Sequence, residues 1–160
     1  MIYNNMITAL QAASYICQRY YQDYGDIIDE MKLHKLLYFA QREAIIVNNE
    51  PLFNEQFVAW KYGPVMLCVR KAYNAYKQGQ FNDVILSDSD LERFENIFDA
   101  VFKRYANKTS WSLSTLTHGE FSWQNARKGL SSDVNGNNMM SIEDIRKDAE
   151  RIKLRRVLFE

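Results

Sequence analysis

Residues 31–47, MKLHKLLYFAQREAIIV, form the segment around which the rest of the sequence is organised. Apolar residues recur in it at steps of three and four, as they do on one face of an α-helix. This set comprises Leu33, Leu36, Leu37, Ala40, Ala44 and Val47, and a second set, Tyr38, Phe39, Ile45 and Ile46, widens the face until it nearly surrounds the helix. Because a helix that is apolar almost all round is a buried one, the segment predicts the central helix of one globular core.

The charged residues of this segment are expected near its ends or along one narrow edge of the helix. They are Lys32, Lys35, Arg42 and Glu43. Asp29 stands just before the run, where a side-chain oxygen can cap the first free backbone N–H groups. Asn48, Asn49 and Pro51 follow it and predict the end of the helix.

The flanking sequence predicts further helices with recognisable caps. Residues 8–21 hold a helical period after Thr8 and end before Gly25, and residues 91–105 form an amphipathic helix after the cap candidates Ser87 to Asp90. Ser141 is placed to cap a final helix. Between these, residues 109–128 predict shorter helical elements separated by Gly119, and residues 131–138 predict a loop.

One stretch suggests a small departure from helix. Residues 52–60, LFNEQFVAW, alternate in part and predict a short strand or an extended loop, and the next helix is predicted to run from Pro64 to about Gly79, with Gly63 giving the turn. The expected fold is therefore mainly α: a single compact multi-helix domain over residues 1–160, built around the buried central helix, with a short β element near residues 52–60.

Composition limits the function classes. The 160 residues contain 20 Lys and Arg against 20 Asp and Glu, so the net charge gives no general attraction to nucleic acid or to a membrane surface. No basic and apolar leader and no apolar run of about 20 residues is present, which predicts a cytoplasmic protein. Cys17 and Cys68 lack a second Cys or a His at metal-site spacing, so buried reduced thiols are expected, with no metal and no cofactor.

Two groups of side chains are candidates for chemistry. Thr117, His118 and Glu120 lie within one turn, where His118 is either a general base oriented by Glu120, a polar contact in an interface, or a buried hydrogen-bonded histidine beside an N-cap threonine. No nucleophile elbow, phosphate loop or catalytic carboxylate pair accompanies them, so the sequence favours a binding module over an enzyme. The basic residues Arg151, Lys153, Arg155 and Arg156 favour a solvated helix end over a phosphate-binding or acid-binding patch.

Three stretches together resemble a known family. KLHKLLYFAQ (residues 32–41), PLFNEQFVAWKYGPV (51–65) and LSTLTHGEFSWQNAR (113–127) are similar, in this order and spacing, to the Panacea domain of SocA-like and GepA-like phage-associated proteins. The resemblance runs from about residue 8 to the last helix. One residue departs from it: the family usually has a proline directly before the tryptophan that follows its Thr-His-x-Glu motif, and here Ser122 stands in that place.

This resemblance implies a mainly α, non-enzymatic antitoxin that neutralises a cognate, adjacently encoded toxin by direct binding. Alternatives are a proteolytic adaptor that delivers its toxin to a ClpXP protease, or a phage-associated interaction module of another kind. Two weaker hypotheses are an enzyme that uses His118 and Glu120, and a DNA-binding autorepressor. The motif residues, expected to form the scaffold or the contact surface for the partner, are Lys32, Leu36, Leu37, Tyr38, Trp60, Tyr62, Gly63, Pro64, Thr117, His118, Glu120 and Trp123.

Overall fold

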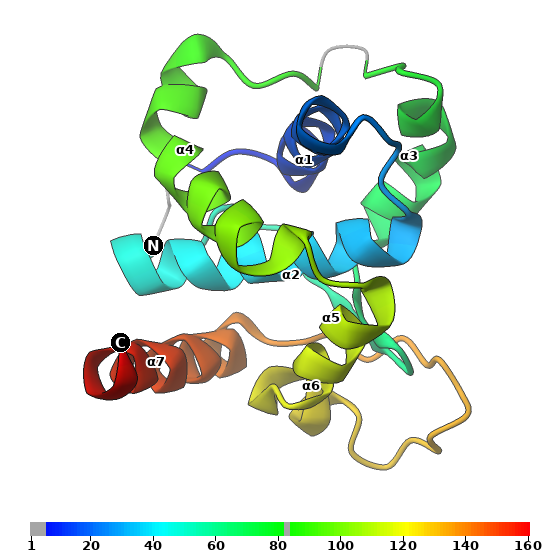
Figure 1. Cartoon of the computed structure of the whole chain (residues 1–160). Helices are drawn as coiled ribbons and strands as arrows, with labels where there is room; N and C mark the ends of the chain where they lie inside the picture. Colours follow the sequence, from blue (N-terminus) through cyan, green and yellow to red (C-terminus); the bar gives the residue numbers. More distant parts are fainter. Residues whose placement is uncertain (1–5, 82–83) are drawn as a thin grey trace.

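Helix α2 (Glu30–Asn48) crosses the middle of the protein in the computed structural model, which describes residues 6–81 and 84–160 (Figure 1). The other helices cover it from two sides. On one side lie α1 (Ala9–Tyr24), α3 (Leu67–Lys77) and α4 (Asp88–Val101), and on the other lie α5 (Ser110–His118), α6 (Phe121–Ala126) and α7 (Ile142–Phe159) (Figure 1). The prediction of a mainly α fold around a buried central helix is confirmed.

Helix α2 begins and ends where its sequence predicts. The carboxylate of Asp29 accepts a hydrogen bond from the backbone N–H of Lys32 at 2.8 Å, and Asn49 ends the helix in the left-handed conformation with φ of 58°. The helix is buried without interruption from Lys32 to Ile45, although Val47 in its last turn is exposed. The apolar pattern therefore identified the core helix correctly over nearly its whole length.

The predicted caps of the other long helices are also present. Thr8 and Gln11 form a reciprocal capping box at the start of α1, and Gly25 ends this helix with φ of 67°. Ser87 caps α4 and Ser141 caps α7, each by accepting a backbone N–H three residues on. These bonds satisfy amide groups that would otherwise lack a partner at the first turn of each helix.

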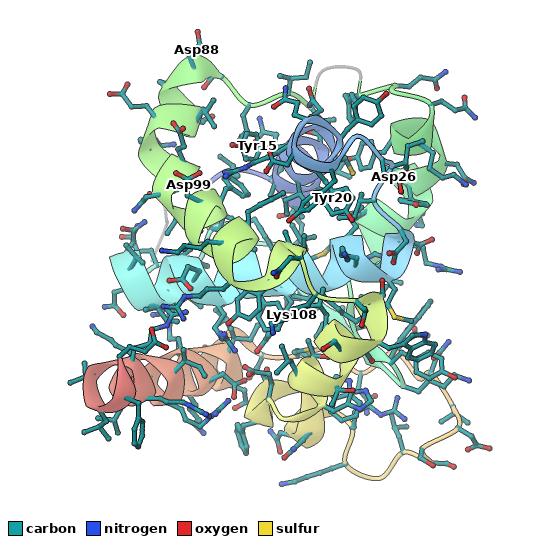
Figure 2. All side chains as sticks on the ribbon, in the orientation of Figure 1. Tyr15, Tyr20, Asp26, Asp88, Asp99 and Lys108 are labelled. Carbon is teal, nitrogen blue, oxygen red and sulfur yellow. The ribbon has the colours of Figure 1, made fainter. Side chains whose placement is uncertain are left out.

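Side chains fill the space between the helices (Figure 2). Between α1 and α4, Tyr15 packs on the ring of Phe98 with centroids 4.5 Å apart, and Arg19 pairs with Asp99. Small residues of α1 (Ala9, Ala12, Ala13) are wholly buried. Of the two free thiols, Cys17 is buried as expected, whereas Cys68 is half-buried.

Two elements differ from the prediction. Strand β1 (Val58–Trp60) lies within the expected extended segment, but it pairs antiparallel with β2 (Gly63–Val65), so the prediction that a helix starts at Pro64 is wrong. Pro64 lies opposite Ala59, whose N–H points away and donates to the carbonyl of Asn138, so a residue without an N–H fits this position.

The second difference is at the end of the amphipathic helix. After α4 the chain makes one wider, π-helical turn, η1 (Phe102–Ala106), in place of a regular helix to residue 105. The ring of Tyr105 stacks on that of Phe39 of α2, with centroids 4.0 Å apart and planes within 10°. The wider turn thereby places a tyrosine hydroxyl beside the charged residues of α2.

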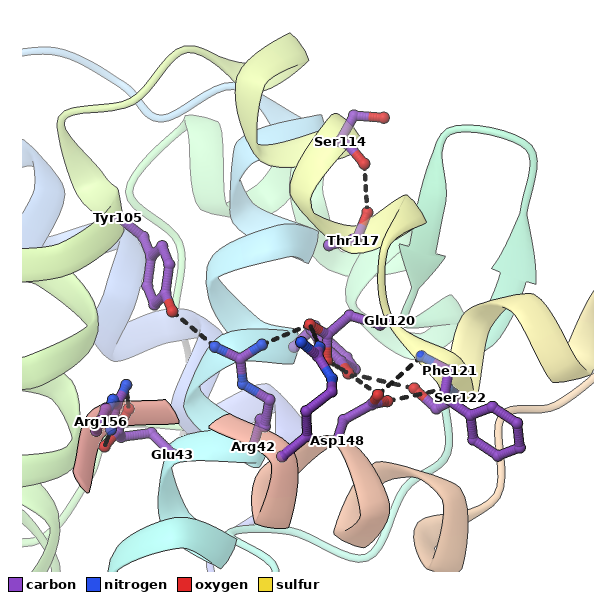
Figure 3. Close-up of polar contacts among 12 residues, drawn as sticks. Arg42, Glu43, Tyr105, Ser114, Thr117, Glu120, Phe121, Ser122, Asp148 and Arg156 are labelled. Carbon is purple, nitrogen blue, oxygen red and sulfur yellow. Dashed lines mark hydrogen bonds and ion pairs between the residues drawn. The ribbon is translucent and has the colours of Figure 1, made fainter. Parts of the chain in front are cut away.

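The four charged residues that were expected near the ends or along one narrow edge of α2 are buried. Lys32, Lys35, Arg42 and Glu43 are only 1–8% exposed. Arg42 donates to Glu120 at 2.7 Å and to the hydroxyl of Tyr105 at 2.6 Å, and the hydroxyl of Tyr38 donates to the other oxygen of Glu120 at 2.7 Å (Figure 3). Burial alone would lower the pKa of Arg42, but Glu120 and the two tyrosines outweigh it and raise that pKa.

Helix α7 closes this network from the far side. Asp148 accepts the backbone N–H groups of Phe121 and Ser122 at 2.8 and 2.9 Å, so that it caps α6 from another helix (Figure 3). Arg151 reaches Glu120 at 3.2 Å. The prediction that the basic end of α7 is solvated is therefore only partly correct, since two arginines of this helix pair with buried carboxylates.

The second of these arginines is Arg156. It makes a bidentate pair with the buried Glu43 at 2.8 and 2.9 Å. Lys153 and Arg155 of the same helix are exposed, as the prediction required. The sequence pattern did not indicate which cations turn inward, because their carboxylates lie far away along the chain.

Replacing Glu120 by glutamine tests the importance of its charge. We expect the free energy of unfolding to fall by about 3–5 kcal/mol, because Arg42 would remain charged in a buried site without its counter-charge. The measurement is urea denaturation with the slope against denaturant compared between variants.

The matched control is Glu160→Gln, which removes the carboxylate of the exposed pair between Glu160 and Arg104. Here we expect little or no loss, because water and salt screen an exposed ion pair. Equal losses in the two variants would contradict the assignment of Glu120 as the centre of the network.

Candidate functional site

The motif residues divide into a buried group and an accessible group. Buried in the fold are Lys32, Leu36, Leu37, Tyr38, Gly63, Pro64, Thr117 and Glu120. The side chains that remain at least partly accessible are Trp60, Tyr62, His118 and Trp123. The accessible group comes from the hairpin, the end of α5 and α6, and the structure brings it together at one place.

These rings, together with Trp111 of α5, form what we call the aromatic surface: Trp60, Tyr62, Trp111, His118 and Trp123. The indole N–H of Trp123 donates to the carbonyl of Trp60 at 2.8 Å, and the ring of His118 stacks on that of Trp123 with centroids 4.2 Å apart. Tyr62 meets Trp111 edge to face at 5.2 Å. Tyr62 is 45% exposed and Trp111 60% exposed, so both present ring area to a partner.

Cations lie over three of these rings. The ammonium of Lys61 lies 5.1 Å from the centroid of Tyr62, and the guanidinium of Arg70 lies 5.1 Å from that of Trp60. The third is the guanidinium of Arg127, 5.8 Å from the centroid of Trp123. Trp, Tyr and Arg are the residues most enriched at the energetic centres of protein interfaces.

Arg127 also holds the predicted loop, residues 131–138, against the hairpin. Its guanidinium donates to four carbonyl oxygens, those of Ala59, Ser131, Val134 and Asn135, at 2.7–3.0 Å. These four hydrogen bonds, together with the one from the indole N–H of Trp60 to the side chain of Asn137, fix the loop beside Trp60. This arginine was not among the predicted site residues, and nothing in its sequence neighbourhood indicated that it would bind four carbonyls.

Gly63 is required beneath the aromatic surface. Its φ of 116° disfavours any residue with a side chain. A Cβ atom there would also lie 2.5 Å from the hydroxyl of Thr117 and 2.7 Å from Cε of Lys35. Thr117 lies inside α5 and donates to the carbonyl of Ser114, so its predicted role as an N-cap is wrong. It is instead a packing contact for the hairpin.

Lys35 lies under the same turn. It is 1% exposed, and its ammonium donates to the carbonyl of Pro64 at 3.1 Å. Burial lowers the pKa of Lys35 to about 8, although Asp29 and Glu30 act in the opposite direction. A charged group in such a position costs stability unless something compensates for its lost hydration.

The neighbouring residue His34 is held neutral. Its Nδ1 accepts the backbone N–H of Met66 at 3.2 Å, so the proton is on Nε2, which donates to Glu30 at 3.0 Å. Burial lowers the pKa of His34. The residue therefore fixes the entry into α3 and is a structural histidine.

His118 is not paired with Glu120. The carboxylate of Glu120 is bound by Arg42 and Tyr38, while the ring of His118 lies on Trp123 and its Nε2 has no hydrogen-bond partner. Partial burial is the main cause that lowers the pKa of His118, and Lys35 and Arg127 lower it further. The expectation of a base oriented by Glu120 is wrong, and of the expected hydrogen-bonded histidine the structure keeps the contact with the backbone of Lys61 but leaves Nε2 without a partner. A neutral stacked ring suits a contact surface.

Ser122, where the resembling family usually has proline, has a local role. Its N–H donates to Asp148, and its hydroxyl lies 3.2 Å from that of Tyr38. A proline could not provide the first of these bonds. The chain thus uses a serine to tie α6 to both α2 and α7.

In the described ranges, 6–81 and 84–160, His, Cys, Asp and Glu side chains do not gather in threes at a place that could hold a metal ion. The helices of the same ranges are too short or too polar to cross a membrane.

Replacing Lys35 by methionine should change how stability depends on pH. An exposed lysine has a pKa of 10.5 and Lys35 in the folded protein one of about 8. Between these values the unfolded chain holds a proton that the folded protein has released, so the free energy of unfolding rises with pH, by about 3 kcal/mol at most. Below pH 8 both states are protonated and the destabilisation is fully present.

The variant should lack this rise. Urea denaturation at pH 7.5, 8.5 and 9.5 gives the free energy of unfolding of wild type and of Lys35→Met. The difference between the two proteins isolates the rise, because the contributions of the other titrating groups cancel in it. Lys77→Met, which removes an exposed lysine of α3, should keep the wild-type rise. A parallel pH dependence of wild type and Lys35→Met would contradict the lowered pKa.

Comparison with known proteins bears on what this surface is for. The family described as "Antitoxin SocA-like, Panacea domain" matches residues 33–124, which run from α2 through α6 and include the hairpin. Antitoxin SocA of Caulobacter vibrioides (strain NA1000 / CB15N) is 42% identical over 48 residues, which are 30% of this chain and 26% of that protein. The match therefore spans about a quarter of the length of that relative. No solved structure matches the chain.

The matched region contains nearly all of the core helix, the Gly63 turn, the buried ion pair and the whole aromatic surface. The loop held by Arg127 lies outside the matched region. The match covers more than half of the chain. The chain therefore belongs to the SocA-like, Panacea-domain family of antitoxins.

Proposed function

We propose that this protein is a cytoplasmic, single-domain antitoxin that neutralises a cognate toxin by binding it directly, and that the toxin is encoded beside it. The observation that carries the proposal is the aromatic surface, formed by the accessible members of the family motif together with Trp111 on a rigid base. The family description supports an antitoxin role of a non-catalytic kind. The proposal adds the mode of action and the place of contact.

The aromatic surface has the physical properties of a protein contact site. Tyr62 and Trp111 supply large rings that lose little conformational entropy on binding, and Lys61 over Tyr62 and Arg70 over Trp60 supply positive charge. The hairpin beneath is fixed by Gly63 and Lys35. A surface that is already ordered before binding loses less free energy to ordering when the partner arrives.

The chemistry of the surface also supports binding in preference to catalysis. His118, its imidazole, has no carboxylate that orients it, because Glu120 is committed to Arg42. A general base needs both a partner within hydrogen-bond reach and a tuned pKa near the working pH. We therefore place the motif residues in two roles: the buried ones hold the fold, and the accessible ones contact the toxin.

The test is co-expression of the tagged protein with the product of each neighbouring gene, followed by a pull-down and a growth assay. We expect one neighbouring product that is toxic alone, harmless with this protein, and recovered with it in a stoichiometric complex. If every neighbouring product is harmless and unbound, the proposal is wrong. Toxin that disappears only when a cellular protease is present would show delivery for degradation instead of neutralisation by binding.

The place of contact is tested by the double variant Tyr62→Ala, Trp111→Ala. We expect the dissociation constant of the complex to rise at least about 100-fold, since loss of central aromatic residues typically costs 2 kcal/mol or more each. Isothermal titration with the purified partner measures this change. Circular dichroism should show an unchanged fold, because both rings are exposed.

The matched control for this variant is Tyr21→Ala, which removes an exposed tyrosine of α1 that is 59% accessible. It should leave the dissociation constant unchanged. A loss of affinity in Tyr21→Ala together with normal binding by the double variant would move the contact surface to α1.

A further inference from the structure

A cleft opens beside the aromatic surface, between α2, the hairpin and α3. Its volume is about 300 Å³, and its walls include His34, Lys35, Trp60, Lys61, Arg70 and Asn135. We call it the Lys35 cleft. A larger cavity of about 460 Å³ lies between α1 and α3, but its lining includes none of the motif residues. The lining of the Lys35 cleft includes three residues of the family motif, Trp60, Tyr62 and Gly63.

The charges around the Lys35 cleft do not balance. Lys35, Lys61 and Arg70 bring three positive charges, whereas Glu30 is the one carboxylate in its lining and is already bonded to Arg70 at 2.7 Å and to His34 at 3.0 Å. Within the described part of the chain, neither Lys35 nor Lys61 has a carboxylate within 4 Å. The cleft therefore carries a local positive charge on a protein with zero net charge.

The neighbouring histidines respond to this charge. Lys35 is among the groups that lower the pKa of His34, after burial, and it also contributes to the lowered pKa of His118 on the far side of the hairpin turn. Arg70 acts on His34 in the same direction. A protonated histidine is disfavoured where the potential is positive, and an anion is favoured there.

We propose that the Lys35 cleft receives an aspartate or glutamate side chain of the protein partner, which meets Lys61 and Arg70 at the mouth while Lys35 contributes its charge from beneath. The inference rests on the proposed function, because it names the group that the toxin presents. Burial of an ammonium without a counter-charge is unfavourable, and an incoming carboxylate compensates for it. The rings of Trp60 and Tyr62 exclude water at the edge of the cleft and so strengthen the attraction.

A protein carboxylate fits this cleft better than the phosphates of a nucleic acid. Proteins that bind nucleic acid spread their cations along a stripe or groove that follows the backbone. Here the cations converge on one cleft with an aromatic rim, which suits a single side chain held among apolar neighbours. The dimensions and the rim thus favour one acidic residue flanked by apolar ones on the partner.

The first test measures the affinity of the partner for the variant Lys61→Gln, by isothermal titration at low and moderate salt. We expect the dissociation constant to rise roughly 10-fold or more and its salt dependence to weaken. The control is Lys77→Gln, which removes a lysine that lies over the ring of Tyr73 at 5.7 Å, much as Lys61 lies over Tyr62. This control should bind as the wild type does.

The second test identifies the carboxylate. A carbodiimide that joins lysine amines to carboxylates without a spacer is applied to the purified complex, and the linked peptides are read by mass spectrometry. We expect Lys61 joined to an aspartate or glutamate of the partner. Links from other lysines of this chain with none from Lys61, or an unchanged dissociation constant for Lys61→Gln, overturn the inference.

The outcomes separate the two proposals. If the wild-type protein binds no neighbouring gene product, the proposed function fails and this inference fails with it. If the wild type binds and Lys61→Gln binds equally well, only the Lys35 cleft is overturned. A salt-sensitive gel shift of mixed-sequence DNA or RNA that Lys61→Gln abolishes would assign the cleft to phosphate and also overturn the inference.

Discussion

The buried ion pair between Arg42 and Glu120 is the interaction on which the rest of the structure depends. A guanidinium in the middle of a core helix is tolerated only if a carboxylate and several hydrogen bonds replace the water it has lost. Glu120 and Tyr105 accept hydrogen bonds from Arg42, Arg151 donates to the same oxygen of Glu120 as Arg42 does, and Tyr38 donates to the other oxygen. These groups come from α2, η1, α7 and the start of α6, so one requirement for charge compensation orients four parts of the chain (Figure 3).

This constraint also explains why scaffold and surface share a motif. Glu120 fixes the start of α6. His118 lies two residues before Glu120 and Trp123 lies three residues after it, so their rings are brought into a stack. On the other side of the turn, Thr117 and Lys35 leave room only for glycine at position 63, which sets the hairpin that carries Trp60 and Tyr62. The accessible rings are therefore positioned by buried residues that cannot touch a partner.

The features predicted correctly from the sequence are those that depend on residues close together in the chain. The caps at Thr8, Asp29, Ser87 and Ser141 and the apolar period of α2 all depend on residues within a few positions of one another, and all are confirmed. The inward direction of Arg42 was not predictable in this way, because its partner is 78 residues away and periodicity alone assigns charge to the surface. Pro64 was misassigned for a related reason: a proline after glycine suits a helix start locally, and only the pairing with Ala59 shows a strand.

The burial of some charges and the exposure of others explain how a chain with zero net charge carries a positive charge at one place. Equal numbers of acidic and basic residues suggest no electrostatic preference, but three of the carboxylates, those of Glu43, Glu120 and Asp148, are buried, and the first two neutralise arginines inside the fold. Among the described residues, Lys35 and Lys61 near the hairpin have no carboxylate within 4 Å. A protein can thus be neutral overall and still present a positive cleft at one place, since charge selects a partner over distances no greater than about 10 Å in physiological salt.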